Sequence, residues 1–366
     1  MGKKSLFIIV LPALLGILTG IVILTINPNA GRHVGDVLYS KGVNVDSYAY
    51  AVAKAAPSVV NIYVTALNAD DSSKERGNEN AEIRNSASGV IMRSDGYIVT
   101  NYHVVPSSNE SGQAIWAMLR TGELYQAFVV GFDPRTDIAV LKVDAPDLKA
   151  IETQGVRHEP QVGDIVLAIG NPNNLGQTVT HGIISATARS GTGLIARNQM
   201  NIREGVQDLI QTDAPINNGN SGGALVNTAG ELVGINTASF NGYQTYGIGF
   251  AVPTKLVTAV MSEIISHGRV IRGYLGISDD GSVPLPNNQG VGIRVGFVDP
   301  FGPAHGILEI GDVIYEVNSR RIGSLKEFIE YISSSGPGTK LSFKILRQDE
   351  ELKLDVILSE DRVGVD

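Results

Sequence analysis

A long succession of short β-branched stretches, each ended by a turn signal, constrains the fold of this chain more than any other feature. The first stretch covers residues 58–64, and the stretches at 89–92 and 97–100 flank Ser94-Asp95-Gly96 as two strands flank a hairpin turn. Further strands are predicted at 125–131, 138–143, 164–169, 178–187, 208–212, 223–226, 231–236 and 247–252. The pattern predicts an all-β barrel or sandwich, with 42 glycines to supply tight turns.

A helical pattern over 253–265 ends this β-rich region and marks a domain boundary. Beyond it, a helix at 325–333 and strands at 274–277, 291–298, 313–317 and 341–346 predict a small α+β unit. A short helix is expected at 48–54. The polar segment 70–85 lacks apolar periodicity and is predicted to be a surface loop.

The N-terminus predicts a membrane anchor. Lys3 and Lys4 precede an uncharged apolar run from Leu6 to Ile26, which is long enough to span a bilayer and longer than the core of most signal peptides. A cleaved signal is the alternative, although Pro28-Asn29-Ala30 is a poor cleavage site. The positive-inside rule places the N-terminus in the cytoplasm and the domains outside it, which in a bacterium is the periplasm.

Four regions are therefore predicted, each with its own role. They are a cytoplasmic stub and transmembrane helix (1–27), a linker (28–46), a β-rich domain (47–266) and a second, α+β domain (267–363).

Charge and composition exclude several classes of function. The net charge of −8 comes without a basic stripe, so nucleic acid is not expected as a partner. The chain has no cysteine, which excludes thiol catalysis and disulfides. We predict no cofactor and no metal site.

The segment Gly219-Asn220-Ser221-Gly222-Gly223 is the strongest candidate for chemistry, because glycines on both sides expose the serine. They also let the backbone N–H groups around Gly219, Asn220 and Ser221 converge as an oxyanion hole. A glycine-rich hairpin turn is the alternative interpretation of this segment alone.

Two further polar positions complete a catalytic set. His103 follows the predicted strand 97–100 and can act as a general base, while Asp137 enters the strand 138–143 and can orient the imidazole. Alone, each has a structural alternative, a hydrogen-bonded histidine or a turn-capping aspartate. The order His, Asp, Ser on a β-rich chain is that of chymotrypsin-like proteases, so we predict a serine endopeptidase with His103, Asp137 and Ser221 as its triad.

Longer segments around these residues resemble the HtrA family of serine proteases. The resemblance rests on Thr136-Asp137-Ile138-Ala139-Val140-Leu141-Lys142, Gly219-Asn220-Ser221-Gly222-Gly223-Ala224-Leu225 and Gly247-Ile248-Gly249-Phe250-Ala251-Val252-Pro253. It implies a two-barrel chymotrypsin-like fold and a homotrimer. Arg189 matches the arginine that links the sensor loop to the active-site loops in that family. Asn218 departs from the histidine or proline usual before Gly-Asn-Ser.

The C-terminal unit resembles a PDZ domain through Gly273-Tyr274-Leu275-Gly276-Ile277 and Gly311-Asp312-Val313-Ile314-Tyr315-Glu316-Val317-Asn318. N–H groups around Tyr274, Leu275, Gly276 and Ile277 could hold a peptide carboxylate while the peptide adds as a strand.

One PDZ domain behind a membrane anchor is similar to the stress-sensing branch of the family. That similarity implies activation by C-terminal peptides of unassembled outer-membrane proteins, and cleavage of an anti-sigma factor by an inner-membrane protease facing the periplasm. A soluble periplasmic quality-control protease or chaperone, and a catalytically idle peptide-binding sensor, are the alternative functions.

Overall fold

The computed structural model describes most of the chain after the predicted linker. The described residues are 47–67, 81–106, 113–153, 159–171, 176–190, 208–217, 219–239, 247–286 and 290–361. Within them no helix is both long and apolar enough to cross a membrane, and the predicted anchor lies outside them.

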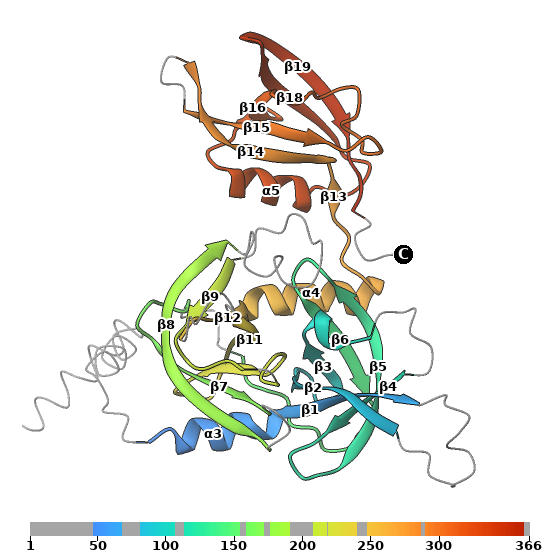
Figure 1. Ribbon diagram of the computed structural model, residues 1–366, viewed down its shortest axis with the longest axis vertical. Helices are drawn as coiled ribbons and strands as arrows, with labels where there is room; N and C mark the ends of the chain where they lie inside the picture. The colour runs from blue at the N-terminus through green and yellow to red at the C-terminus, as the bar shows by residue number, and fades with distance from the viewer. Residues whose placement is uncertain are drawn as a thin grey trace, which may run out of the picture. The chain divides into compact units, whose positions relative to one another are not determined.

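Six strands close a first barrel in the order β1-β2-β3-β6-β5-β4 (Figure 1). Their bounds are β1 Val59–Leu67, β2 Ala81–Ile91, β3 Tyr97–Thr100, β4 Gln113–Met118, β5 Leu124–Asp133 and β6 Ile138–Val143. β-Branched and aliphatic side chains such as Ile62, Ile98 and Leu141 fill its interior and are completely buried. Closing the sheet leaves none of these strands with an open edge.

A second barrel repeats this plan in the order β10-β11-β12-β9-β8-β7. It comprises β7 Ile165–Gly170, β8 Thr178–Ser190, β9 Asp208–Thr212, β10 Ala224–Asn227, β11 Leu232–Ser239 and β12 Gly249–Pro253. Ile184, Leu225 and Ala251 are among its buried core residues. The β10 and β11 strands follow the Ser221 turn, so this barrel fixes the position of that serine.

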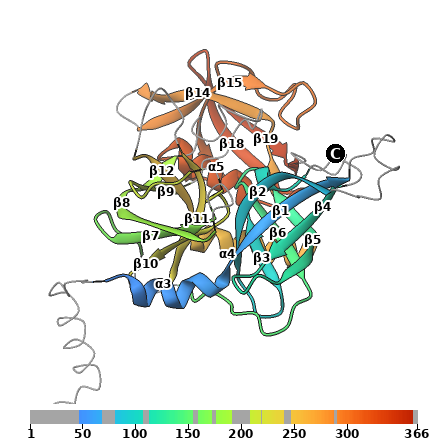
Figure 2. The same ribbon diagram turned by 60° about the horizontal axis from the view of Figure 1, so that its bottom comes forward.

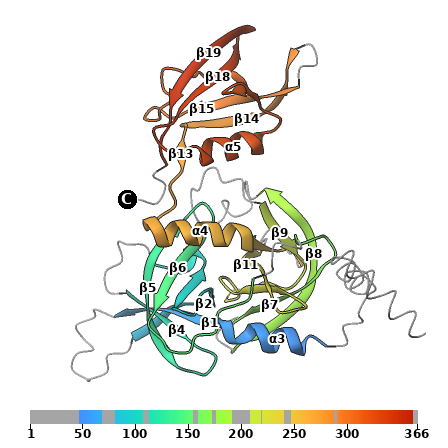
Figure 3. The same cartoon turned by 180° about the vertical axis from the view of Figure 1, so that it is seen from behind.

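Two helices pack on the outside of the barrels. Helix α3, Ala49–Ala55, lies beside β10 (Figure 2) and is held there by Lys54, whose Nζ pairs with Glu152 at 2.8 Å and donates to the Ala229 carbonyl. Helix α4, Thr254–His267, contacts strands β5, β6, β11 and β12, and so touches both barrels (Figure 3). It ends at Gly268, whose φ of 77° suits glycine.

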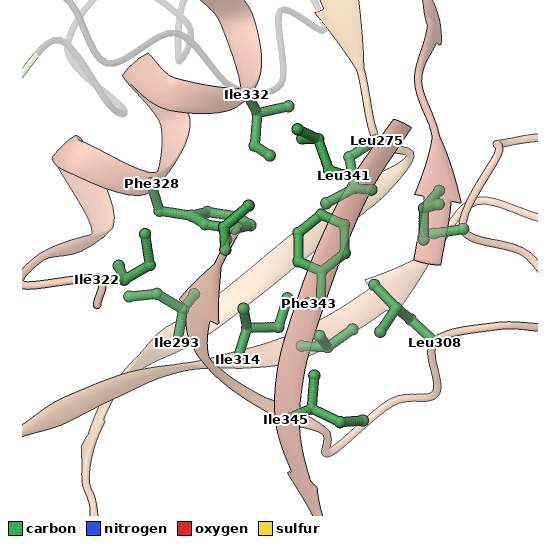
Figure 4. Packing of buried hydrophobic residues seen from close by; sticks show 14 of the residues in the cluster. Leu275, Ile293, Leu308, Ile314, Ile322, Phe328, Ile332, Leu341, Phe343 and Ile345 are labelled. Carbon is green, nitrogen blue, oxygen red and sulfur yellow. The ribbon is translucent and has the colours of Figure 1, made fainter. Parts of the chain in front are cut away.

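The C-terminal unit contains one six-stranded sheet. Five of its strands follow the order β14-β15-β16-β18-β19, the sixth, β17, pairs with β16, and one helix packs on the core. The strands are β13 Gly273–Tyr274, β14 Ile277–Pro284, β15 Val291–Val298, β16 Val313–Val317, β17 Arg320–Arg321, β18 Lys340–Arg347, β19 Glu350–Ile357 and β20 Ser359–Glu360; β13 pairs with β20. Helix α5, Leu325–Ser334, begins after Ser324, whose side chain accepts from the N–H of Glu327. Phe328 and Ile332 on α5 point toward Phe343 on β18 in the middle of the core (Figure 4).

Most of the predicted elements are confirmed, with three differences. The predicted surface loop 70–85 is wrong at its C-terminal end, because 81–85 belong to β2 and pair with 64–67 of β1; residues 68–80 lie outside the described part. The predicted strand 274–277 is broken at Leu275 and Gly276. Strands β4, β17, β19 and β20, and all of β14 after Ile277, are not predicted by the sequence patterns used above.

Candidate active site

Asp137 stands at the end of a tight turn that leads from β5 into β6. The Asp137 side chain is buried, and its backbone has a φ of 54°, a left-handed conformation that costs energy for any residue with a side chain. Asn101 fixes this backbone by donating its side-chain amide to the Asp137 carbonyl at 3.0 Å. The strained turn thus delivers a carboxylate into the interior between the barrels.

His103 lies on a single 3₁₀ turn, Tyr102–Val104, directly after β3. Its Nδ1 is 3.0 Å and 2.9 Å from the two carboxylate oxygens of Asp137, and its backbone N–H donates to Oδ1 at 3.1 Å. Burial alone would lower the pKa of His103, but the hydrogen bond to Asp137 and the charge of that carboxylate together raise the pKa above its ordinary value. The predicted pairing of His103 with Asp137 is present in the structure.

Thr237 is a third partner of the carboxylate that the sequence interpretation missed. Its hydroxyl donates to Asp137 Oδ2 at 2.6 Å, and the residue is almost completely buried at the end of β11. Asp137 belongs to the first barrel and Thr237 to the second, so this hydrogen bond joins the two halves of the site. No motif marks Thr237, since its partner is 100 residues away in the chain.

The Ser221 turn depends on two glycines with positive φ, Gly219 at 96° and Gly222 at 80°. A Cβ at Gly222 would lie 2.1 Å from the Ser88 carbonyl oxygen, which no side chain can tolerate. The Ser221 hydroxyl donates to the backbone oxygen of Thr237 at 3.1 Å rather than to His103. The serine is therefore placed in the site, while its hydroxyl still points to a backbone acceptor.

Ser88, also missed in the sequence interpretation, shapes the predicted oxyanion loop. Its hydroxyl donates to the Gly219 carbonyl at 2.7 Å, and its N–H donates to the Ser221 carbonyl at 2.9 Å. Both carbonyls of the loop are therefore held by one residue of β2. The N–H of Asn220 is already used, because it donates to the Asn217 carbonyl at 2.9 Å, so including Asn220 among the oxyanion donors was wrong.

Gly219 and Ser221 are the loop residues whose N–H groups have no acceptor among the described residues. Asn218, on which the preceding peptide depends, lies outside that part of the chain. The arrangement has a nucleophile, a base held by a carboxylate, and two donors on one turn, which are the parts that acyl transfer from a peptide bond requires. In the same described ranges no group of three potential metal ligands occurs.

The predicted peptide-binding loop lies between β13 and β14. Gly276 has a φ of 79°, and a Cβ there would meet Gly302 at 2.9 Å, so the loop needs glycine. Tyr274 points its hydroxyl to Asp299 at 2.7 Å. Beside the loop is a cavity of about 210 Å³, lined by Leu275 and Ile277 together with apolar residues of α5 such as Phe328 and Ile332. The loop residues singled out in the sequence therefore lie at a cavity that is lined in part by apolar side chains.

Arg189 lies in β8, where its backbone pairs with Leu209 of β9. The described part of the chain does not include its side chain. Its linking role stays a prediction.

Comparison with known proteins gives concordant matches for both units. Residues 87–235 match the trypsin-like peptidase domain model, and residues 273–358 match the PDZ domain model. The chain is 40% identical over 361 residues to serine endoprotease DegS of Salmonella typhimurium, spanning 94% of this chain and 96% of that protein. It is 43% identical over 324 residues to DegS of Escherichia coli K12, covering 86% of each. The chain belongs to the HtrA family of serine endoproteases.

Solved protease structures agree with this family assignment. AlgW, an HtrA-type protease solved with a tripeptide, aligns with a TM-score of 0.70 at 40% identity over 86% of this chain and 97% of that one. The serine endoprotease of Yersinia pestis aligns with a TM-score of 0.67 at 42% identity, over 86% and 98%. The two-barrel chymotrypsin-like fold followed by a PDZ domain is confirmed, and this HtrA protein is a serine endopeptidase.

Proposed function

We propose that Ser221 is the nucleophile of this protease, with His103 as its general base and Asp137 as the group that orients and stabilises the histidine. The observation that carries the proposal is the Asp137 carboxylate, which accepts from His103 Nδ1, from the His103 N–H and from Thr237. This holds Nδ1 protonated and turns Nε2 into the free base.

In the proposed reaction the Ser221 hydroxyl leaves Thr237 and gives its proton to His103 Nε2 as it attacks the peptide carbonyl. The oxyanion that forms would be bound by the N–H groups of Gly219 and Ser221. The protonated His103 then gives its proton to the leaving amine, and water repeats the cycle on the acyl-enzyme.

The test is cleavage of an unfolded protein substrate by Ser221→Ala, with Ser94→Ala in the exposed β2–β3 turn as a matched control. Ser221→Ala should lose several orders of magnitude in turnover while keeping its unfolding midpoint, and Ser94→Ala should change neither. Near-normal turnover of the Ser221 variant contradicts the assignment.

We further propose that the protease is held in a resting state until a peptide carboxylate occupies the PDZ loop at 274–277. Two observations support this. The Ser221 hydroxyl bonds to a backbone carbonyl instead of His103. Arg272, just before the PDZ domain, makes two hydrogen bonds of 2.7 Å to the buried Asp133, four residues before Asp137. A change in the PDZ domain can thus reach the triad through a single turn.

The cellular role that we propose is envelope-stress sensing by a homotrimer anchored in the inner membrane, with its domains in the periplasm. C-terminal peptides of unassembled outer-membrane proteins would activate it, and its substrate would be an anti-sigma factor. The support is the apolar run 6–26, the single PDZ domain, and similarity to DegS proteins over most of the chain. Arg189 is the proposed link between the sensor loop and the active-site loops.

Membrane fractionation and proteomics test this role. We expect the full chain to resist carbonate extraction, and a membrane-bound anti-sigma factor to accumulate in cells that carry Ser221→Ala. A mature chain that begins near Gly31 in the soluble fraction would instead favour the soluble quality-control protease.

A further inference from the structure

The cavity beside the PDZ loop is not built from the PDZ domain alone. Besides Leu275 and the apolar face of α5, its lining includes Arg135 and Thr136 from the turn that precedes Asp137, and Asp361 just after β20. A ligand in the loop would therefore meet a basic residue of the protease domain.

Arg135 is held at this cavity by an ion pair with Asp361. The Arg135 Nε donates to Asp361 Oδ2, and the side chains are 14% and 9% exposed. The attraction between charges this protected from water is screened less than that of an exposed surface pair. Asp361 is itself tied to the PDZ linker, because its N–H donates to the Arg272 carbonyl at 3.0 Å.

The second arginine at the cavity is already committed elsewhere. Both terminal nitrogens of Arg272 donate to the Asp133 carboxylate, whose exposure is 4%. Arg135 is paired instead with a carboxylate at the edge of the PDZ unit, which an incoming carboxylate can replace charge for charge.

We infer that Arg135 completes the peptide-carboxylate site of the PDZ domain, and that the C-terminal carboxylate of a ligand takes the place of Asp361 on this arginine. The inference rests on the proposed function of the PDZ loop. The N–H groups of 275–277 would bind one carboxylate oxygen and the Arg135 guanidinium the other, with the terminal side chain on Leu275 and Phe328. Asp361 then acts as an internal occupant that keeps Arg135 desolvated and aimed at the cavity in the absence of ligand.

This exchange also explains how the protease domain could register that the loop is occupied. Arg135 lies two residues before Asp137, inside the strained turn. When Arg135 exchanges Asp361 for the ligand carboxylate, the turn is no longer attached to the C-terminal end of the PDZ unit. It is attached to the bound peptide instead.

Fluorescence anisotropy on the full chain in detergent, carrying Ser221→Ala to prevent cleavage, tests the inference. The probes are labelled decapeptides with a common Gly-Ser body that end in Val, Leu, Ile, Phe or Tyr, each made as the free acid and as the amide. Such ends fit the apolar floor of the cavity. Arg135→Gln should weaken the acid peptides about tenfold and leave the amides unchanged, since the lost contact is an ion pair.

Asp361→Asn should do the opposite and tighten the acid peptides about threefold or more, because their competitor for Arg135 is gone. Adding Arg135→Gln to Asp361→Asn should cancel that gain. Arg320→Gln, which removes an exposed ion pair with Glu327 elsewhere on the PDZ domain, is the matched control and should alter neither probe. Thermal unfolding of each variant checks that it is folded.

The outcomes separate this inference from the proposed function. If acid peptides bind the otherwise unchanged protein better than amides but Arg135→Gln leaves their ratio intact, the inference is overturned and PDZ recognition stands. A purely structural role for the ion pair would weaken both probes equally in both variants, which also overturns it. If no acid peptide binds at all, peptide sensing by this loop fails, and the inference fails with it.

Discussion

The substitution Thr237→Val removes one hydroxyl and should show how much the hydrogen bond from Thr237 to the Asp137 carboxylate contributes to stability and to catalysis. Valine keeps the shape of threonine, and the backbone oxygen that accepts from Ser221 stays in place. What is lost is the 2.6 Å hydrogen bond to Asp137 Oδ2, in a place where Thr237 is 2% and Asp137 is 4% exposed. A hydrogen bond to a charged group contributes about 1.5–3 kcal/mol, and little water can enter here to replace it.

That free energy divides between folding and catalysis. The hydrogen bond from Thr237 to Asp137 is already present in the enzyme without substrate, so most of the loss should appear as a free energy of unfolding lowered by about 1–2 kcal/mol. The rate of cleavage falls only to the extent that the hydrogen bond from Thr237 becomes stronger in the transition state, when His103 takes up a proton. The remaining part, about 0.5–1 kcal/mol, should lower kcat about two- to fivefold while KM stays nearly constant.

Urea unfolding and steady-state cleavage kinetics measure the two effects. Thr254→Val is the matched control, because its hydroxyl donates to a neutral carbonyl, that of Leu232, at the start of α4. It should lower stability by about 1 kcal/mol and leave kcat unchanged. A Thr237→Val enzyme with unaltered kcat, or with an altered KM alone, would show that the carboxylate does not need this support.

Three shorter predictions concern the same site. The acid limb of kcat/KM should lie above pH ~6.5, because only neutral His103 is a base and its pKa is raised; Asp137→Asn should move the limb to lower pH, since burial then dominates. By linkage, protonated His103 stabilises the fold fully below pH ~6.5, and this stability is lost as the pH rises through the raised pKa, which urea unfolding at several pH values can follow. Gly222→Ala should abolish cleavage and lower the unfolding midpoint, because its Cβ would meet the Ser88 carbonyl at 2.1 Å; an active, stable variant contradicts the turn geometry.

Sequence patterns succeeded where the interaction that fixes a residue is local. Asp137 and Ser221 lie in short turns whose glycine and polar residues are adjacent in the chain. The apolar run that predicts β6 is likewise visible in neighbouring residues, and every residue of that strand except Lys142 is buried. Such features depend on a window of a few residues, which the sequence displays directly.

Long-range partners could not be found in this way. Ser88 holds the Gly219 carbonyl across 131 residues, and Thr237 holds Asp137 across 100. Nothing in the neighbourhood of either residue marks it as part of a site. The first residues of β2, 81–85, include the polar Glu82, Arg84 and Asn85. They form a strand because β1 offers them backbone partners, which is a tertiary effect that outweighs local propensity.

Three residues in the turn from Asp133 to Asp137 each form an ion pair, and the free energies of such pairs indicate how regulation could work. Its first residue binds Arg272 from the PDZ linker, its third binds Asp361 from the end of the PDZ unit, and its last orients His103. Allosteric coupling in proteins is typically about 1–3 kcal/mol, or about 5–150-fold in binding affinity. One partly buried ion pair that changes partner is of this magnitude. The regulation proposed above therefore does not require a large rearrangement: exchanging the partner of Arg135, while the Arg272–Asp133 pair stays in place, would supply enough free energy to move the Ser221 hydroxyl from the Thr237 carbonyl to His103.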